Sequence, residues 1–360
     1  MKRIFLTHIL PEPMIREHGL SSAACNFSFN LMSGGGFDEV FSILGISVSG
    51  YLNPIAYNDK RFTIIYNTTF RKLGRIGVKL AVIIEQVSLF FKIRRGSSIW
   101  LYNVSTLNVF LYVLLRIFKR SVLINVIELD FTPVEKGCGQ NQLFLKVINN
   151  CHGNIRLAES PLFTNENSIT LPGVVPLNSG MEPLIEQPNK CFLLSGVLLE
   201  NIAQTSMVLK AFSELPQCEL HITGVLEDDS KLKEYASRYS NIIWHGNVSF
   251  KEYLDIMHSC TFQLSTRDPK YPENQCNFPS KIIETLLHNR AVVSTIEYKQ
   301  LEDINYFKVD SIIDRFIADI HAIAIMDEGA LDKYVNQGKK VAQKFSTTVW
   351  NESMKSIELR

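Results

Sequence analysis

The stretch NFPSKIIETLLHNRAVVST, residues Asn277–Thr295, contains the alternation that decides the fold. A proline and a serine, Pro279 and Ser280, stand at the start of a helical pattern that runs to Leu287. Proline suits the first position of a helix, and serine is a good cap. A short apolar run, Ala291–Thr295, follows directly and predicts a buried strand. A helix that leads into a buried strand is the building unit of parallel α/β sheets.

The same alternation extends in both directions from this stretch through the second half of the chain. The predicted strands there are Lys190–Ser195, Cys218–Thr223, Ile242–His245, Thr261–Ser265 and Ala291–Thr295. The predicted helices are Ala203–Glu214, Asp228–Tyr239, Phe250–Ser259, Ser280–Leu287, Asp314–Ile325, Asp332–Lys344 and Thr347–Ile357.

The first half of the chain alternates in the same way. Its predicted strands are Arg3–Leu6, Glu39–Ile43, Thr63–Tyr66, Ser98–Tyr102, Val122–Glu128 and Ile155–Leu157. Its predicted helices are Ser21–Met32, Arg75–Ile93, Leu107–Arg120 and Asn141–Asn149. Repeated βαβ units in both halves predict parallel sheets covered by helices.

A change of composition between the halves predicts two domains. The stretch PGVVPLNSGMEPLIEQPN, Pro172–Asn189, is rich in proline, glycine and polar residues and is typical of a linker. We expect an N-terminal domain over residues 1–175, a linker over 176–189, a C-terminal domain over 190–345, and a final helix over 346–360 that returns toward the first domain. The fold class is α/β, with two Rossmann-like doubly wound domains that face each other across a cleft. Ligands of such sheets bind beyond the carboxyl ends of the strands.

Composition excludes several classes of protein. Of 360 residues, 46% are hydrophobic and 20% are charged, which is too apolar for a disordered chain. Lys and Arg total 37 against 36 Asp and Glu, so no global charge favours a nucleic-acid partner. The apolar start of the chain is too short and too interrupted for a signal peptide, and the stretch Leu107–Phe118 is too short to span a bilayer. We therefore expect a cytoplasmic location.

The cysteines are odd in number, scattered, and without a CxxC pair. This pattern fits reduced thiols and disfavours both a disulfide framework and a zinc site. They are Cys25, Cys138, Cys151, Cys191, Cys218, Cys260 and Cys276.

Lys281 occupies an unusual place for a cation. It lies in the first turn of the helix predicted from Ser280, where free N–H groups and the helix dipole favour an anion. A lysine there is explained if a phosphate occupies the site. Glu284 follows one turn later on nearly the same face, where its carboxylate could accept hydrogen bonds from ribose or sugar hydroxyls. The alternative is a capped surface helix with an incidental Lys–Glu pair.

Four segments together resemble a known family. Ser195-Gly196, His221-Ile222-Thr223-Gly224, His245-Gly246-Asn247-Val248 and Phe278–Glu284 look like the C-terminal domain of retaining GT-B glycosyltransferases (family-4-like) that build bacterial O-antigen and capsule. The resemblance is clear over Lys190–Thr295. It implies that the helix from Pro279 supports the donor phosphate and ribose. The donor-binding roles that it implies fall on Gly196, Gly246, Asn247, Val248, Ser280, Lys281 and Glu284. Further donor-binding candidates from the same part of the chain are Ser195, Gly224, Arg267, Asn277, Phe278 and Pro279.

The sequence departs from that family in two places. Many members have a second glutamate eight positions before the one matched by Glu284, but Cys276 stands there. Glu273 or Asn274 could substitute for it. Many members also have an arginine and a lysine shortly after the first glycine, whereas the stretch VLLENIAQT, 197–205, has no basic residue. The donor diphosphate would then depend on Lys281, the helix N-terminus and Arg267.

Three segments of the N-terminal half are further candidates. Asp130, after the strand Val122–Glu128, resembles the residue that faces the donor sugar in the family and is the catalytic candidate; an Asx turn before Pro133 is the alternative. Ser21 and Ser22 could cap a helix that faces the acceptor. Gly34, Gly35 and Gly36 could allow close approach of a ligand, or could simply form a helix C-cap and turn.

The resemblance implies transfer of a sugar from a UDP- or GDP-linked donor to a lipid-linked or growing oligosaccharide of a surface polysaccharide, with retention. The nucleotide sugar is a substrate, and no cofactor is expected. No metal is expected either, because no DxD-type triplet ends a strand and Asp228-Asp229 begins a helix. The alternatives are a non-catalytic binding partner of the same fold and a sugar-nucleotide epimerase.

Two segments raise the question of a membrane surface. Arg71–Arg95 and Leu107–Arg120 combine apolar helical patterns with clustered Lys and Arg. Such helices suit adsorption to an anionic leaflet, where a lipid-linked acceptor resides. We therefore consider peripheral contact with the inner face of the cytoplasmic membrane; packing of both helices on the sheet is the competing interpretation.

Overall fold

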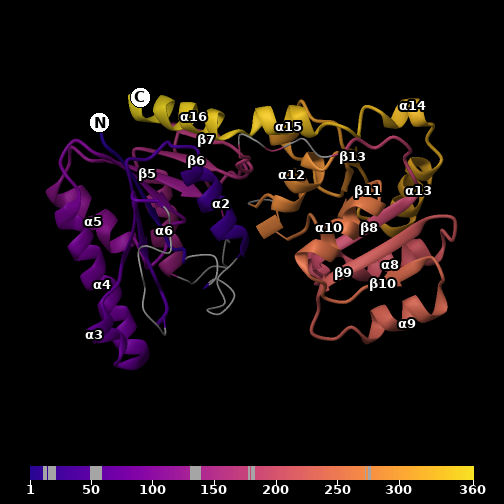
Figure 1. Cartoon of the computed structure of the whole chain (residues 1–360), viewed down its shortest axis with the longest axis horizontal. Helices are drawn as coiled ribbons and strands as arrows, with labels where there is room; N and C mark the ends of the chain where they lie inside the picture. The colour runs from indigo at the N-terminus through magenta and orange to yellow at the C-terminus, as the bar shows by residue number, and fades with distance from the viewer. Residues whose placement is uncertain are drawn as a thin grey trace. The chain divides into compact units, whose positions relative to one another are not determined.

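The computed structural model describes residues 1–10, 14, 22–48, 59–129, 139–176, 179, 183–271, 273–274 and 277–360. The chain separates into two compact units, each with its own sheet (Figure 1). Unit 1 comprises Met1–Leu177 and Phe345–Arg360, and unit 2 comprises Asn178–Lys344. The final segment of the chain therefore belongs to the same unit as its beginning.

Unit 1 contains a seven-stranded parallel sheet in the spatial order β3-β2-β1-β4-β5-β6-β7. Because the chain reverses its direction of progress between β1 and β4, this sheet has a Rossmann-like order. The strands are β1 Arg3–Thr7, β2 Glu39–Ile43, β3 Phe62–Ile65, β4 Ser98–Tyr102, β5 Leu123–Glu128, β6 Gly153–Arg156 and β7 Ser168–Thr170.

Helices cover both faces of the unit 1 sheet. On one face, Leu89, Leu111 and Val147 of three successive helices share a buried core with strand residues. On the other face, Phe27 packs against both Tyr102 and Trp350. The helices are α2 Ser22–Ser33, α3 Thr68–Arg71, α4 Gly74–Lys92, α5 Val109–Phe118, α6 Gly139–Asn150 and α16 Thr347–Leu359.

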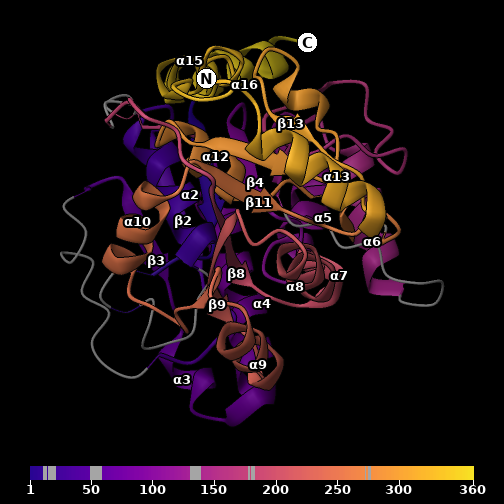
Figure 2. The ribbon, with the colours of Figure 1, turned by 90° about the vertical axis from the view of Figure 1, so that its right-hand side faces the viewer.

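Unit 2 contains a six-stranded parallel sheet in the order β10-β9-β8-β11-β12-β13, with the reversal between β8 and β11. Its helices also lie on both faces; Figure 2 shows α10 on one side of β8 and β9, and α8 on the other. The strands are β8 Cys191–Val197, β9 Glu219–Val225, β10 Ile242–Trp244, β11 Phe262–Ser265, β12 Ala291–Ser294 and β13 Phe307–Lys308. The helices are α7 Glu200–Ala203, α8 Thr205–Ser213, α9 Ser230–Arg238, α10 Phe250–Ser259, α12 Ser280–Leu287, α13 Ile313–Ala324, α14 Glu328–Leu331 and α15 Gly338–Lys344.

The predicted fold class, two Rossmann-like parallel sheets, is confirmed, and most elements lie within a few residues of their predicted bounds. Two predicted helices are wrong in detail. The predicted helix Ala203–Glu214 is preceded by a separate short helix, α7, because Gln204 adopts a left-handed conformation with φ of 43°. The predicted helix Asp332–Lys344 is interrupted, since Asn336 has φ of 58° and the helix resumes only at Gly338.

The glycines Gly34, Gly35 and Gly36 form a turn that packs against α16. Gly35 has φ of 72° and its N–H bonds to the carbonyl of Met32, which ends α2. A β-carbon on Gly34 would lie 2.5 Å from Cβ of Thr347, and one on Gly36 would lie 1.8 Å from Asn351 Oδ1. The turn precedes β2, so it lies at the amino end of that strand. The hypothesis that these glycines belong to an acceptor-side loop and allow close approach of a ligand is therefore wrong, and the alternative of a helix C-cap and turn packed against α16 accounts for them.

Glu358 fastens α16 to the sheet of unit 1. Its carboxylate accepts hydrogen bonds from Arg3 Nε and Nη2 at 2.8 and 2.5 Å, from Ser98 Oγ at 2.5 Å and from Trp100 Nε1 at 2.8 Å. The side chain is only 5% exposed. Burial acts to raise the pKa of Glu358, but the hydrogen bonds and the charge of Arg3 outweigh it, and the pKa is lowered. The carboxylate is thus stabilised in its charged form.

We expect Glu358→Ala to destabilise unit 1 by about 3 kcal/mol, because it leaves a half-buried arginine and a buried indole without their acceptor. Glu358→Gln should cost less, and its difference from the wild type should shrink at acid pH. The sign follows from the lowered pKa: the stabilisation is present above the unfolded-state pKa and is lost as pH falls through the folded-state pKa. Urea unfolding followed by circular dichroism measures both effects.

Glu352→Gln provides the matched control, because Glu352 lies on the same helix and is exposed. An equal loss of stability in Glu352→Gln and Glu358→Gln would contradict the assigned role of Glu358.

Candidate functional site

The carboxyl edge of the unit 2 sheet brings three of the predicted glycines together. Gly196 is near the end of β8, Gly224 near the end of β9, and Gly246 follows β10; their φ angles are 103°, 149° and 76°. A β-carbon on Gly224 would lie 1.9 Å from the carbonyl oxygen of Gly196. The N–H of Gly224 donates to the carbonyl of Gly246 at 3.1 Å. Only glycine fits this close backbone packing.

The hydroxyl groups of Thr223 and Ser195 make hydrogen bonds that stabilise this edge of the sheet. The hydroxyl of Thr223 donates to the carbonyl of Gly246 at 2.8 Å, and Ser195 Oγ accepts from Gln263 Nε2 at 3.2 Å. Ser195 is buried. Its hydroxyl therefore holds neighbouring strands together, and its predicted contact with a donor is restricted to its backbone.

Helix α12 begins beside these glycines, after β11. The N-cap is Pro279, which makes no side-chain hydrogen bond, and Ser280 is the first helical residue. The expectation that Ser280 caps the helix is therefore wrong: its hydroxyl lies inside the first turn and is exposed. The first turn is left without a side-chain cap, which leaves its N–H groups suited to an anion.

Lys281 reaches from α12 to the end of β8. A β-carbon on Gly196 would lie 2.2 Å from Lys281 Nζ, so the ammonium group takes the space beside that glycine. The pKa of Lys281 is lowered to about 8, first by burial and then by the nearby positive charge of Arg267, against the opposing effect of Glu284. A cation held in such surroundings favours an anionic ligand, which would replace the lost hydration.

Glu284 lies one turn further along α12 and is held by Tyr253 of α10. The Tyr253 hydroxyl donates to Glu284 Oε2 at 3.1 Å. Burial raises the pKa of Glu284, although the Tyr253 hydrogen bond and the charge of Lys281 oppose this. The pKa of Tyr253 is raised as well, by burial first and then by the charge of Glu284. Tyr253 was not among the predicted site residues, because its distance in sequence from α12 gives no signal.

The loop before α12 contributes Arg267, whose Nη1 donates to Asn274 Oδ1 at 3.2 Å. The amide of Asn274 also donates to the carbonyls of Asn201 and Asp268, and Asn274 is buried. Asn274 therefore organises this loop and is a poor substitute for the missing glutamate. Cys276 lies outside the described residues.

The remaining predicted donor residues occupy different environments. Phe278 is buried, with its ring 4.8 Å from that of Tyr298, and Pro279 is buried too. These two side chains pack in the core, so the predicted contact of Phe278 and Pro279 with a donor would involve their backbone and not their side chains. Asn277 and Val248 are half-buried, and Asn247 is exposed in the loop after β10.

Three predicted residues of the N-terminal half cannot be placed in this way. Asp130 and Ser21 lie outside the described residues. Ser22 begins α2, but its side chain is not described.

Similarity of this chain to known proteins is found in structure at low sequence identity. No protein-family profile and no curated protein sequence matches the chain. Solved structures do match it along its whole length, at low sequence identity.

Three of these structures illustrate the match. The α,α-trehalose-phosphate synthase (UDP-forming) from Burkholderia xenovorans, in complex with glucose-6-phosphate, has a TM-score of 0.67 at 10% identity, covering 99% of this chain and 100% of that one. A trehalose-6-phosphate protein from E. coli bound with UDP-2-fluoro glucose has 0.66 at 9% identity, covering 99% and 98%. AviGT4, a glycosyltransferase involved in avilamycin A biosynthesis, has 0.60 at 12% identity, covering 99% and 97%. The chain thus has the two-domain GT-B fold.

The lowered pKa of Lys281 predicts that this residue costs stability in the ligand-free protein. We expect Lys281→Met to raise the melting temperature at pH 7 by a few degrees, since about 1 kcal/mol corresponds to ~2–4 °C for domains of this size. The folded-state pKa of about 8 lies below the ordinary value of 10.5, so the cost is full below pH 8 and disappears toward pH 10.5. The gain in melting temperature should therefore decline as the pH is raised above 8.

Lys210→Met is the control, because Lys210 is an exposed residue of α8 in the same unit. A gain for Lys281→Met that is absent, or that does not change with pH, would contradict the desolvated position of Lys281.

Proposed function

We propose that this chain is a glycosyltransferase that binds a nucleotide sugar at the carboxyl edge of the unit 2 sheet. The observation that carries this proposal is the ammonium group of Lys281 beside the backbone of Gly196, at the uncapped start of α12. The diphosphate of the donor would neutralise Lys281 and accept hydrogen bonds from the first-turn N–H groups. One structure of this fold holds UDP-2-fluoro glucose, which is a nucleotide sugar, and another holds glucose-6-phosphate, which is a sugar phosphate.

The same groups would act on the reaction itself. As the bond from the sugar to the diphosphate breaks, negative charge develops on the departing phosphate oxygen. Lys281, Arg267 and the dipole of α12 are placed to stabilise that charge without a metal ion. Glu284, fixed by Tyr253, would accept hydrogen bonds from the ribose hydroxyls. In this proposal Asp130 faces the donor sugar and the transfer proceeds with retention, as the family resemblance implies.

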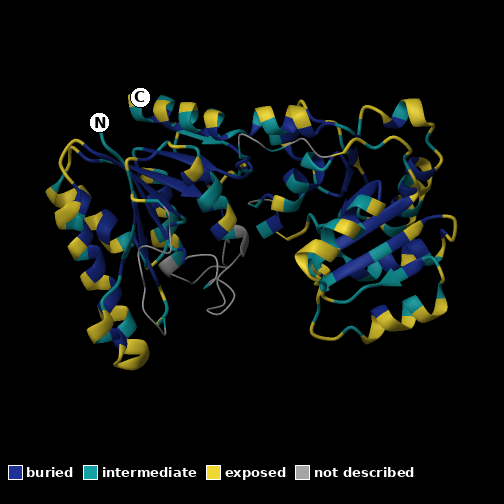
Figure 3. Cartoon of the chain, viewed as in Figure 1, coloured by how far each residue is buried: buried dark blue, intermediate teal, exposed yellow. Residues whose placement is uncertain are grey.

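The exposed surface of α4 and α5 favours the proposal that the acceptor is linked to a lipid. Ile76, Phe91 and Ile117 are 75%, 75% and 57% exposed. Figure 3 shows exposed residues along both helices. The exposed apolar ones, here called the stripe, also include Leu80, Ile83, Ile84, Phe110, Val113 and Phe118. Packing on the sheet buries the opposite side of each helix. It therefore explains the apolar residues on that side and not the exposed ones.

The charge around this stripe is of one sign. The only acidic residue between Thr68 and Ser121 is Glu85, and it is buried in an ion pair with Arg71 at 2.7 Å. Exposed basic residues surround the stripe; they are Lys72, Arg75, Lys79, Lys92, Arg94, Arg95, Arg116 and Arg120. Apolar side chains within a basic rim suit an anionic lipid surface.

A groove at the start of α4 offers a place for the acceptor itself. It has a volume of about 510 Å³ and lies between Gly45–Ser47, which follow β2, and the first turns of α4, with Arg75 and Lys79 in its wall. Two cations could hold the phosphates of a lipid diphosphate while the apolar stripe contacts the membrane. We propose that the acceptor is a lipid-linked or growing oligosaccharide of a surface polysaccharide, met at the inner face of the cytoplasmic membrane.

One feature of the site favours a second candidate, a non-catalytic binding partner of the same fold. Many members of the family that the sequence resembles have an arginine and a lysine after the strand matched by β8. The corresponding segment here has no basic residue and contains Glu200 at the start of α7. With fewer cations the leaving diphosphate would be stabilised less. Binding of a nucleotide sugar without transfer or hydrolysis would support this candidate.

Among the described residues, no helix is both long enough and apolar enough to cross a membrane.

The donor proposal is tested by calorimetric titration of UDP, GDP and a panel of their sugars. Lys281→Met should weaken binding by about 10–100-fold, since a charge-assisted contact contributes roughly 1.5–3 kcal/mol. Glu284→Gln should reduce affinity by about tenfold. Lys210→Met should bind as the wild type does. Unchanged affinity for every ligand in the double variant Lys281→Met/Glu284→Gln would sink the proposal.

The membrane proposal is tested by sedimentation with vesicles of phosphatidylglycerol and phosphatidylcholine, and with vesicles of phosphatidylcholine alone. The protein should prefer the anionic vesicles. Ile76→Asp/Ile117→Asp should abolish binding, and Arg75→Gln/Lys79→Gln should weaken it by roughly tenfold or more, at about 1 kcal/mol per cation. The control is Leu184→Asp, because Leu184 is a similarly exposed apolar residue of unit 2. Equal losses in the control and in Ile76→Asp/Ile117→Asp would contradict a specific surface.

A further inference from the structure

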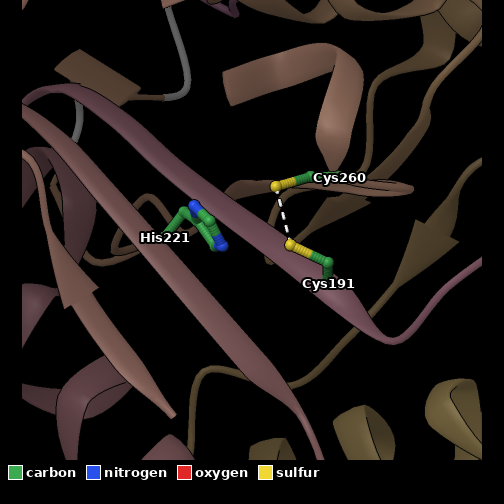
Figure 4. Close-up of side chains that lie close together, drawn as sticks. All are labelled: Cys191, His221 and Cys260. Carbon is green, nitrogen blue, oxygen red and sulfur yellow. Dashed lines mark hydrogen bonds between the residues drawn. The ribbon is translucent and has the colours of Figure 1, made fainter. Parts of the chain in front are cut away.

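Two cysteines that are 69 residues apart meet under helix α10. Cys191 is the first residue of β8, and Cys260 is the C-cap of α10. Their Sγ atoms are 2.8 Å apart, and both side chains are buried. Figure 4 shows the two sulfurs directed toward each other, with the ring of His221 beside them. One ligand atom from each of the three residues lies within 4.8 Å of the others.

The register of the sheet brings His221 to this place. Cys191 pairs with Glu219, and Leu193 pairs with His221. Since residues two apart in a strand share a face, these four side chains lie on the same side of the sheet. α10 covers that side, where Met257 packs with Cys191, Leu193 and Cys260. The cluster therefore depends on two neighbouring strands and one helix that covers them.

The chemistry of these donors is that of a soft-metal site. Two thiols and one imidazole are the ligand types that Zn²⁺ takes in tetrahedral sites. The imidazole also has the outer partner that metal-binding histidines commonly use. Nε2 of His221 is 2.5 Å from Glu219 Oε1, and such a carboxylate orients the ring and increases the basicity of its other nitrogen.

A fourth donor is close to the cluster. Nδ1 of His221 is 2.9 Å from Nε2 of His245, and the two rings are stacked with centroids 5.0 Å apart. His245 directly follows β10, the short strand that pairs with β9. A fourth coordination position could thus be filled by His245 or by water, as sites with three protein ligands allow.

We propose that Cys191, Cys260 and His221 form a binding site for a divalent metal ion of the Zn²⁺ type. With Zn–S bonds of about 2.3 Å and tetrahedral angles, the two sulfurs would be about 3.8 Å apart, so binding opens the pair by roughly 1 Å. Rotation of the cysteine side chains supplies a movement of this size. Both thiols release their protons to solvent when the metal binds.

This site is separate from the proposed donor site and serves to position α10. Cys191 is at the amino end of β8, whereas Ser195 and Gly196 are at its carboxyl end. Cys260 ends α10, and Tyr253 on the same helix donates to Glu284. A metal bound to Cys260 and Cys191 would fix the end of α10 to β8 and so the position of Tyr253.

The experiment uses the full chain, reduced and freed of metal with a chelator, and titrated with Co²⁺. We expect one equivalent to bind, with the visible bands of tetrahedral cobalt and a near-ultraviolet thiolate-to-cobalt charge-transfer band. Addition of Zn²⁺ should remove both. Cys191→Ser and Cys260→Ser should lose the charge-transfer band or reduce it severely, and His221→Ala should weaken binding by about 10–100-fold.

Cys218→Ser is the matched control, because Cys218 is also a buried cysteine of unit 2 but lies outside the cluster; its spectrum should equal that of the wild type. If the serine variants fail to fold, alkylation of the native wild-type protein with and without Zn²⁺ tests the proposal instead. Zn²⁺ should reduce the alkylation of Cys191 and Cys260, as mapped by mass spectrometry. Three results would overturn the proposal: a reduced wild-type protein without the cobalt bands, unchanged bands in Cys191→Ser, or a Cys191–Cys260 disulfide that persists in excess glutathione.

Discussion

The ammonium group of Lys281, held against the backbone of Gly196, is the constraint on which the proposed donor site depends. Residue 196 favours glycine, because its φ of 103° strains any other residue and a β-carbon there would displace Lys281 Nζ. Gly224 must be glycine as well, because its own β-carbon would collide with the Gly196 carbonyl. The backbone at the carboxyl edge is thus shaped around one poorly hydrated cation. A diphosphate is the ligand that would restore the interactions lost to burial.

Helix α10 connects the two proposed binding sites of unit 2. Near its start, Tyr253 donates to Glu284 and fixes the carboxylate that follows Lys281 by one turn. At its end, Cys260 meets Cys191 and the His221 ring. One helix therefore spans the sheet from the proposed sugar-nucleotide site to the proposed metal site. A rigid element of this kind positions catalytic or binding groups more exactly in space than a loop does.

The helices of unit 1 differ in how completely their side chains are paired. Helix α16 is attached to the sheet by a buried carboxylate, whereas α4 and α5 expose apolar residues. The buried Glu358 carboxylate binds α16 to β1 and β4 through four hydrogen bonds. Helices α4 and α5 expose apolar side chains to solvent. Glu85, the single acidic residue between Thr68 and Ser121, is neutralised by a buried ion pair with Arg71. Exposing so much apolar surface is unfavourable for a free monomer, and the proposed contact with a membrane would cover it.

The sequence by itself determined the α/β class, the two sheets and most element bounds, because strand and helix periodicities and turn residues are local properties. It also singled out Lys281 and Glu284, since their spacing on one helix is local too. It could not show that Phe278 and the Ser195 hydroxyl are buried, that Gly34–Gly36 pack against α16, or that Tyr253 reaches Glu284. It could not bring Cys191, His221 and Cys260 together, and their scatter even argued against a metal. Those relations join residues that are distant along the chain, and only strand order, register and helix packing decide which of them meet.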